Sequence, residues 1–235
     1  MTTTALPSPS FSSAPLRTAI VLATLVAGLV TRPEAQSVPL SLERLTLKGV
    51  VADRASYQNR DAIRLLESDS SRNTLGIAII NGITFKDGAI DVDVAGRRGP
   101  NAAPDDRGFI GLAFRISPNA ERFEYIYLRP DNGRVDDQIR RNHATQYGSH
   151  PDFTFQRMRK EFPEKYESYV DLEYGAWTHM RIEVAGTTAK LHVHGAAQPA
   201  LVVTDLKLGP AEGGIALWIG SGTEGFFSNL RVSAR

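Results

Sequence analysis

The sequence predicts an all-β protein built as a two-sheet antiparallel sandwich. Short runs of alternating or β-branched residues recur along the chain, with turn-forming residues between them. None of these runs keeps a long helical period. About eleven strands of this length suggest two packed sheets.

The predicted strands follow these runs in order. A tight hairpin separates two of them, because Gly186 and two threonines lie between alternating runs, and glycine supplies the backbone angle that such turns need. No linker or fixed repeat divides the chain, so residues 38–235 are predicted to form one domain. The strands are expected at residues 45–51, 62–67, 76–80, 89–95, 109–116, 123–129, 177–185, 189–194, 200–205, 214–219 and 226–232.

A long polar segment, residues 129–172, interrupts this strand pattern. It is dense in Arg, Asp, His, Gln and Tyr and has no sustained period of two. Connections within domains usually have about 4 to 6 residues, and much longer ones tend to be functional or disordered. Six aromatic residues argue against disorder: Tyr147, Phe153, Phe155, Phe162, Tyr166 and Tyr169. The segment is therefore predicted to be a long loop that forms the wall or lid of a site, with short helical turns interrupted at Pro163.

The strands next to this segment carry a predicted trough. Side chains alternate across a strand, so the two faces can be assigned separately. One face of residues 109–116 holds small residues and an arginine, and one face of residues 123–129 holds aromatic residues and another arginine. Aromatic rings can stack on the C–H faces of a sugar ring, small residues leave room for it, and the planar donors of arginine can bind its hydroxyls. The predicted trough residues are Arg115, Tyr125, Tyr127, Arg129 and Trp218. The alternative is a second buried layer, since Phe and Tyr are more often packing residues.

The polar segment also supplies candidate site residues. Asp137 and His143 are suited to general acid and base roles. Asn142 and Gln146 could orient hydroxyl groups, and Tyr147 lies beside them. The alternative is a solvated, ion-paired loop, which is the usual meaning of a run of surface charges.

The first 37 residues resemble an export signal. Arg17 precedes the apolar run 19–30, and Ala35-Gln36-Ser37 supplies small residues at the positions that a signal peptidase reads, so cleavage is expected after Ser37. The run is shorter than the ~20 residues of a membrane span, so no permanent span is expected after cleavage, although an uncleaved anchor is the alternative. Export predicts a periplasmic or secreted protein. Removing this segment leaves equal numbers of basic and acidic residues, which argues against a nucleic-acid partner.

Several chemistries lack their residues or motifs. The chain has no cysteine, which excludes disulfides and thiolate chemistry. No serine elbow, phosphate loop or H-E-x-x-H motif is present. His192 and His194 share a strand face without a matching carboxylate, so no metal site is predicted. No cofactor is predicted either.

Five stretches, in order, resemble a known superfamily. They are ITFKDGAIDVDVAG, GFIGLAFRIS, RFEYIYLRP, WTHMRIEVAGTTAKLHVHG and GGIALWIGSGTEGFFSNLRV. Together they are similar to the concanavalin A-like lectin/glucanase superfamily, and within it to laminin-G-like domains and bacterial 3-keto-disaccharide hydrolase-like domains. The resemblance covers residues 40–235 and implies a jelly roll whose concave sheet holds carbohydrate. The E-x-D-x-x-E strand of the retaining glucanases is missing, and no calcium-binding motif matches, so no catalytic residue carries over.

Three functions follow as hypotheses. The leading one is an exported domain that binds a carbohydrate or related polyol in the trough, under the segment 129–172. The second is a glycoside hydrolase that uses Asp137 and His143. The third is an envelope protein-interaction module without a small ligand.

Overall fold

The computed structural model describes residues 1–4, 35–68 and 76–234. The described residues form two antiparallel sheets, with 49% of residues in strands and 9% in helices, which confirms the predicted jelly-roll sandwich. Most of the predicted export signal, residues 5–34, lies outside them. In the described part of the chain, no helix has the length and apolar character needed to span a membrane.

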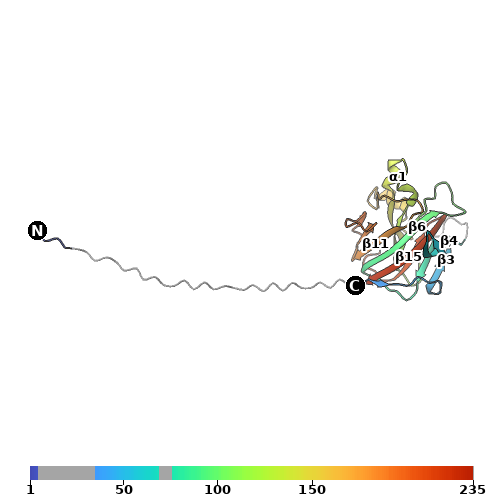
Figure 1. The fold of residues 1–235 in the computed structure, drawn as a ribbon, viewed down its shortest axis with the longest axis horizontal. Helices are drawn as coiled ribbons and strands as arrows, with labels where there is room; N and C mark the ends of the chain where they lie inside the picture. Colours follow the sequence, from blue (N-terminus) through green and yellow to red (C-terminus); the bar gives the residue numbers. More distant parts are fainter. Residues whose placement is uncertain (5–34, 69–75, 235) are drawn as a thin grey trace. The chain divides into compact units, whose positions relative to one another are not determined.

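Sheet A has eight strands among the residues that the structure describes. Seven follow the order β13-β12-β11-β6-β15-β4-β3, and β1 pairs with β15. Figure 1 shows the broad face of this sheet, where β11, β6, β15, β4 and β3 lie side by side. The strands are β1 (Gln36–Ser37), β3 (Val50–Tyr57), β4 (Arg60–Glu67), β6 (Gly88–Arg98), β11 (Thr178–Ala185), β12 (Thr188–Val193), β13 (Leu201–Val203) and β15 (Thr223–Ala234).

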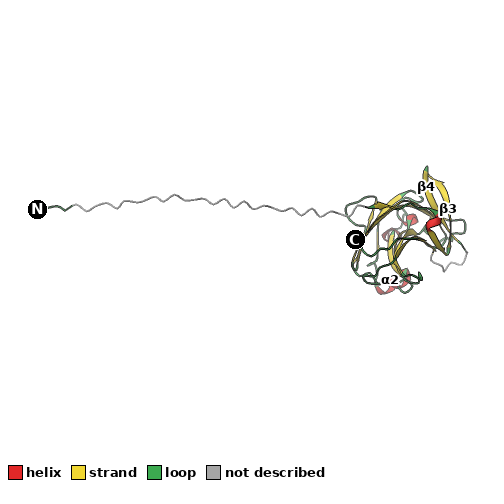
Figure 2. Cartoon of the chain, turned by 90° about the horizontal axis from the view of Figure 1, so that it is seen from below, coloured by secondary structure: helices red, strands yellow, loops and turns green. Residues whose placement is uncertain are grey.

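In the described part of the chain, sheet B has seven strands in the order β10-β9-β8-β7-β14-β5-β2. Figure 2 shows the strands as curved layers, with α2 at the periphery. The strands are β2 (Leu45–Lys48), β5 (Gly76–Ile80), β7 (Ile110–Ile116), β8 (Phe123–Leu128), β9 (Thr145–His150), β10 (Glu167–Ser168) and β14 (Gly214–Ile219). Within the described ranges, four short helices connect strands, namely η1 (Leu42–Arg44), η2 (Pro130–Asn132), α1 (Gln138–Asn142) and α2 (Phe155–Glu161).

The main core lies between the two sheets. Ile90 and Val92 from β6 and Leu112 and Leu217 from sheet B are fully buried in one cluster. Because alternate residues of a strand point to opposite faces, the remaining side chains of sheet B point away from sheet A, onto an outer face. That outer face carries a second apolar cluster: Ile77, Ala113, Ile116, Ala120, Phe123, Tyr125, Tyr127, Ala216 and Trp218.

A β-bulge at Arg115 changes the predicted faces of β7. Ile116 pairs with Gly214 and Phe114 with Ile215, so Arg115 is an extra residue, and its φ of 54° is left-handed. Its side chain leaves the face of Gly111 and Ala113, and Ile116 moves to the outer face. The expectation that Arg115 continues the trough is therefore corrected.

The segment 129–172 is not a continuous loop. It contains η2, α1, β9, α2 and β10, and β9 extends sheet B by pairing with β8. One of the expected helical turns is α2, which ends at Glu161, before Pro163. The segment thus adds two strands, β9 and β10, to sheet B. It also forms a wall beside the outer face of that sheet.

Candidate functional site

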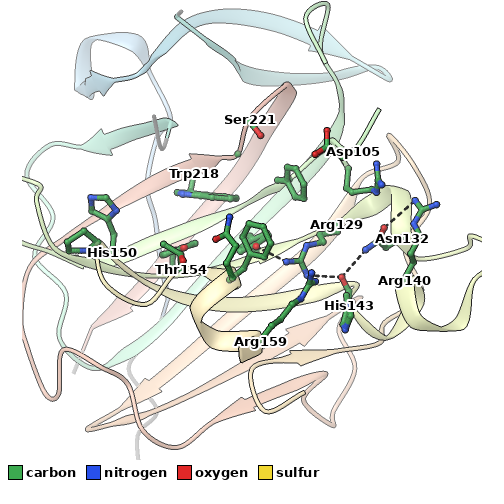
Figure 3. A pocket seen from close by; sticks show the side chains of 18 residues that line it. Asp105, Arg129, Asn132, Arg140, His143, His150, Thr154, Arg159, Trp218 and Ser221 are labelled. Atoms are coloured by element: carbon green, nitrogen blue, oxygen red, sulfur yellow. Dashed lines mark hydrogen bonds between the residues drawn. The ribbon is translucent and has the colours of Figure 1, made fainter. Parts of the chain in front are cut away.

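A cleft of about 570 Å³ opens on the outer face of sheet B. We call it the aromatic cleft (Figure 3). Strands β8 and β14 supply the aromatic residues of its floor, and the region around α2 forms one wall. Its lining residues are Asp105, Arg107, Phe109, Tyr125, Tyr127, Arg129, Asn132, Arg140, His143, His150, Pro151, Thr154, Phe155, Gln156, Arg159, Trp218, Gly220 and Ser221.

Three aromatic side chains form the floor. The ring centroid of Trp218 lies 5.3 Å from that of Tyr125 and 4.6 Å from that of Tyr127. Gly111 pairs with Tyr127 on one side and Trp218 on the other. A Cβ atom on Gly111 would lie 2.6 Å from the Tyr127 Cα, so only glycine leaves room for this arrangement. Because Gly111 has no side chain, the rings of Tyr127 and Trp218 on the two neighbouring strands can approach each other above it.

The floor holds two phenols and one indole with polar atoms. Burial raises the pKa of Tyr125 and of Tyr127, so both hydroxyls stay neutral at physiological pH. Nε1 of Trp218 is buried and has no hydrogen-bond partner among the described residues. An indole N–H usually has a partner when it is buried, so this unpaired donor is an unusual feature of the floor.

Arg129 joins the floor to the wall. Its Nη2 donates to Tyr127 Oη at 2.8 Å and to Gln146 Oε1 at 2.9 Å. Its Nη1 donates to the His143 carbonyl and to Glu167 Oε1, both at 2.9 Å. Four bonds from one buried guanidinium fix its position, so Arg129 is a rigid support for Tyr127.

Glu167 is the carboxylate shared by the basic side chains of this wall. Arg159 donates to it through Nε and Nη2, with a shortest distance of 2.6 Å, and Arg129 donates from the other side. Burial acts to raise the pKa of Glu167, but the hydrogen bond from Arg159 and the two positive charges outweigh it and lower the pKa. The carboxylate is therefore ionised at neutral pH.

His143 lies beside this cluster. Its Nε2 is 3.7 Å from Glu167 Oε2. Burial lowers the pKa of His143, and the nearby positive charges of Arg159 and Arg129 act in the same direction, against the attraction of Glu167. The imidazole is thus neutral at physiological pH and can accept or donate a hydrogen bond in the cleft.

The lowered pKa of His143 predicts a pH-dependent stability. A folded-state pKa below the ordinary 6.5 means that the unfolded chain binds the proton more readily. The stability contributed by the neutral imidazole is therefore lost as pH falls below about 6.5. Urea unfolding of the wild type and of His143→Gln between pH 7.5 and 5 measures this loss.

The wild type and His143→Gln share their other titrating groups, so the contributions of those groups to the pH dependence cancel in the comparison. His150 has a pKa shift of the same sign, and Glu124, whose pKa burial raises, has the opposite sign. We expect the free energy of unfolding of the wild type to fall more steeply towards acid than that of His143→Gln. Identical slopes would contradict the assignment.

Five of the predicted site residues line the aromatic cleft. They are Tyr125, Tyr127, Arg129, His143 and Trp218. A sixth, Gln146, is buried behind the lining, where it accepts from Arg129 and donates to the Tyr147 carbonyl at 2.8 Å. The structure thus brings most of the predicted trough together with one residue of the polar segment.

Four predicted site residues lie away from the cleft. The Arg115 side chain is fully buried and donates to the carbonyls of Lys86, Gly186 and Gly209 and to Asp87. Tyr147 points into the main core and donates to Glu124, because it occupies the opposite face of β9 from Gln146.

The remaining two, Asp137 and Asn142, lie at the two ends of α1. Asp137 is exposed and caps the helix by accepting from the Arg140 backbone N–H at 3.1 Å. Asn142 is exposed and accepts from Gln138 at 2.7 Å. The expected pairing of Asp137 with His143 at one site is therefore corrected, since only His143 lines the cleft.

Several cleft residues were missed from the sequence. Phe155 and Arg159 come from α2, and Arg107 and Asn132 precede or follow strands β7 and β8. Glu167 lies 38 positions from Arg129 along the chain. The spacing of Phe155 and Arg159, four residues apart on one helix, is the signal that could have placed them on a shared face.

Comparison with known proteins identifies the fold. No family model and no curated protein matches the sequence. Among solved structures, the carbohydrate-binding module CBM66 from Bacillus subtilis has a TM-score of 0.52 and 13% identity, covering 80% of this chain and 97% of that one. A Bacillus subtilis protein of unknown function with a galectin-like fold has a TM-score of 0.51 and 10% identity, covering 82% and 91%. The chain therefore has the jelly-roll fold of these proteins, as its resemblance to concanavalin A-like domains implied.

Proposed function

We propose that the protein binds carbohydrate in the aromatic cleft. The observation that carries the proposal is a floor of Tyr125, Tyr127 and Trp218 beside a wall of arginine, histidine and amide groups. Aromatic faces accept the C–H surface of a sugar ring, and the wall supplies directional partners for its hydroxyls. The jelly-roll fold shared with a carbohydrate-binding module is in agreement with this function.

Acid–base catalysis by Asp137 and His143 is not part of this proposal. The Asp137 carboxylate caps α1 outside the cleft, so the pair lacks a common substrate position. Export also remains a prediction from the first 37 residues. Gln36 and Ser37 pair with Val232 and Arg231 of β15, and cleavage after Ser37 would remove this short strand.

A binding experiment on Phe155 tests the proposal. Phe155 lines the cleft and is 37% exposed, so its truncation disturbs the fold less than truncation of Tyr127 or Trp218 would. Loss of one aromatic contact weakens binding about tenfold. We therefore expect Phe155→Ala to bind about tenfold more weakly than the wild type to glycans identified on an array, with affinities measured by calorimetry.

The matched control is Tyr169→Ala. Tyr169 is 41% exposed and accepts a hydrogen bond from Arg141, but it does not line the cleft. Its replacement should leave glycan affinity within about twofold. Absence of any glycan binding by the folded wild type, or equal weakening by both variants, would contradict the proposed site.

A further inference from the structure

The aromatic cleft carries more basic than acidic side chains. Its lining includes four arginines, Arg107, Arg129, Arg140 and Arg159, and two histidines, His143 and His150. Asp105 is the one carboxylate among the lining residues. Figure 3 shows Arg129, His143, Asn132 and Arg140 following one another along the same wall.

The carboxylates behind the wall do not balance these charges. Glu167 is shared by Arg129 and Arg159, at 2.9 and 2.6 Å. Asp131 is shared by Arg98 and Arg140, at 2.6 and 3.6 Å. Because each acid serves two guanidinium groups, the wall keeps an excess of positive charge.

Arg140 is the least satisfied of these arginines. Its Nη2 makes two long contacts, 3.3 Å to the Asp131 carbonyl and 3.4 Å to Asn132 Oδ1. Its Nε is buried and has no hydrogen-bond partner within the described part of the chain. A guanidinium has five N–H donors, so Arg140 retains the capacity to bind an acceptor in the cleft.

Arg107 lines the same cleft and the same neighbouring cavity as Arg140. Its Nη1 donates to the main-chain carbonyls of Pro104 and Asp106 at 2.7 and 2.9 Å. Burial lowers the pKa of Arg107, and the positive charges of Arg140 and Arg98 lower it further, against the attraction of Asp131 and Asp105. Two cations held near each other disfavour both charged forms, and a bound anion relieves that repulsion.

We infer that the ligand of the aromatic cleft is an acidic saccharide, with its ring on the aromatic floor and its carboxylate or sulfate between Arg107 and Arg140. This inference rests on the proposed carbohydrate binding. Planar guanidinium groups match the two oxygens of such an anion and bind it through charge-assisted hydrogen bonds. Arg107 and Arg140 also line a neighbouring cavity of about 390 Å³, which gives space for further sugar units beyond the anionic group.

Matched acidic and neutral glycans test the inference. Calorimetry compares oligogalacturonate with its fully methyl-esterified form, and a sulfated oligosaccharide with its desulfated form. We expect at least one acidic member to bind about tenfold more tightly than its neutral partner, with an affinity that falls as salt is raised. The two pairs distinguish a carboxylate ligand from a sulfate ligand.

Two variants and a control locate the anion. Arg140→Gln and Arg107→Gln should each weaken the acidic glycan about tenfold and leave the neutral partner within about twofold. Arg157→Gln is the control, because Arg157 lies on α2, pairs with Glu161 at 2.8 Å and does not line the cleft. It should change neither affinity.

The outcomes separate this inference from the proposal beneath it. Equal binding of acidic and neutral members, or acidic binding that both variants leave unchanged, overturns the inference while carbohydrate binding stands. Absence of binding to every glycan, acidic or neutral, by a folded protein overturns both.

Discussion

Glu167→Gln should lower the free energy of unfolding by about 3 to 5 kcal/mol, the cost of removing one partner from a buried ion pair. The Glu167 side chain is 3% exposed and accepts hydrogen bonds from Arg129 and Arg159. A glutamine keeps the shape but loses the charge, and its amide N–H₂ group faces guanidinium donors. Arg129, itself buried, is then left without a counter-charge. Urea denaturation at neutral pH measures the change.

Glu161→Gln is the matched control. Glu161 pairs with Arg157 one helical turn away, and both side chains are about four-tenths exposed. Exposed pairs of this kind contribute about 0.3 to 0.5 kcal/mol, so the control should be almost as stable as the wild type. A loss below about 1 kcal/mol in Glu167→Gln would show that Glu167 is not the counter-charge that the cluster requires.

Arg115→Met should destabilise the fold by about 2 to 4 kcal/mol, because it removes a buried charged donor and leaves acceptors without partners. The guanidinium serves the carbonyls of Lys86, Gly186 and Gly209 and the Asp87 carboxylate. These groups come from three separate connections between strands, so one side chain ties them together. Urea denaturation again measures the effect.

The same variant also tests the corrected position of Arg115. Because Arg115 does not line the aromatic cleft, folded Arg115→Met should bind glycans as tightly as the wild type. Arg122→Met is the control for stability, since Arg122 is exposed on a turn and surface substitutions usually change stability by less than about 0.5 kcal/mol. Weakened glycan binding by folded Arg115→Met would return this residue to the site.

Much of the sandwich could be predicted because its strands follow simple patterns. The strands Gly76–Ile80 and Gly214–Ile219 begin and end where expected, since each is an apolar run that starts at a glycine. The predicted strand 45–51 is in fact two strands in different sheets. Gly49, with a φ of 67°, separates them, and the apolar alternation continues across that break without a signal of it.

Strand β9 was missed because its composition is polar. Its cleft face carries Gln146, Gly148 and His150, which lack the apolar character of a recognisable strand. Gly148 is nevertheless required, because a Cβ atom there would lie 2.4 Å from the Tyr125 ring. The strand is stabilised by its pairing with β8, and such tertiary context overrides local propensity.

The candidate site was predictable in its floor and less so in its wall. Alternation along β8 placed Tyr125 and Tyr127 together, because that rule depends only on backbone geometry. The bulge that removed Arg115 from this face has no marker in the sequence, since an arginine with positive φ is uncommon. The pairing of Arg129 with Glu167 joins residues 38 positions apart and depends on the path of the whole segment.

The positions of the two tryptophans make one of them an intrinsic fluorescent probe of the cleft. Trp218 contacts two tyrosine rings in the cleft floor, whereas Trp177 donates to the Tyr57 carbonyl beside sheet A and lies under Arg60. The chain has no other tryptophan. In a Trp177→Phe background, the whole indole emission therefore comes from the cleft floor, and occupancy can be followed by fluorescence titration without attaching a dye.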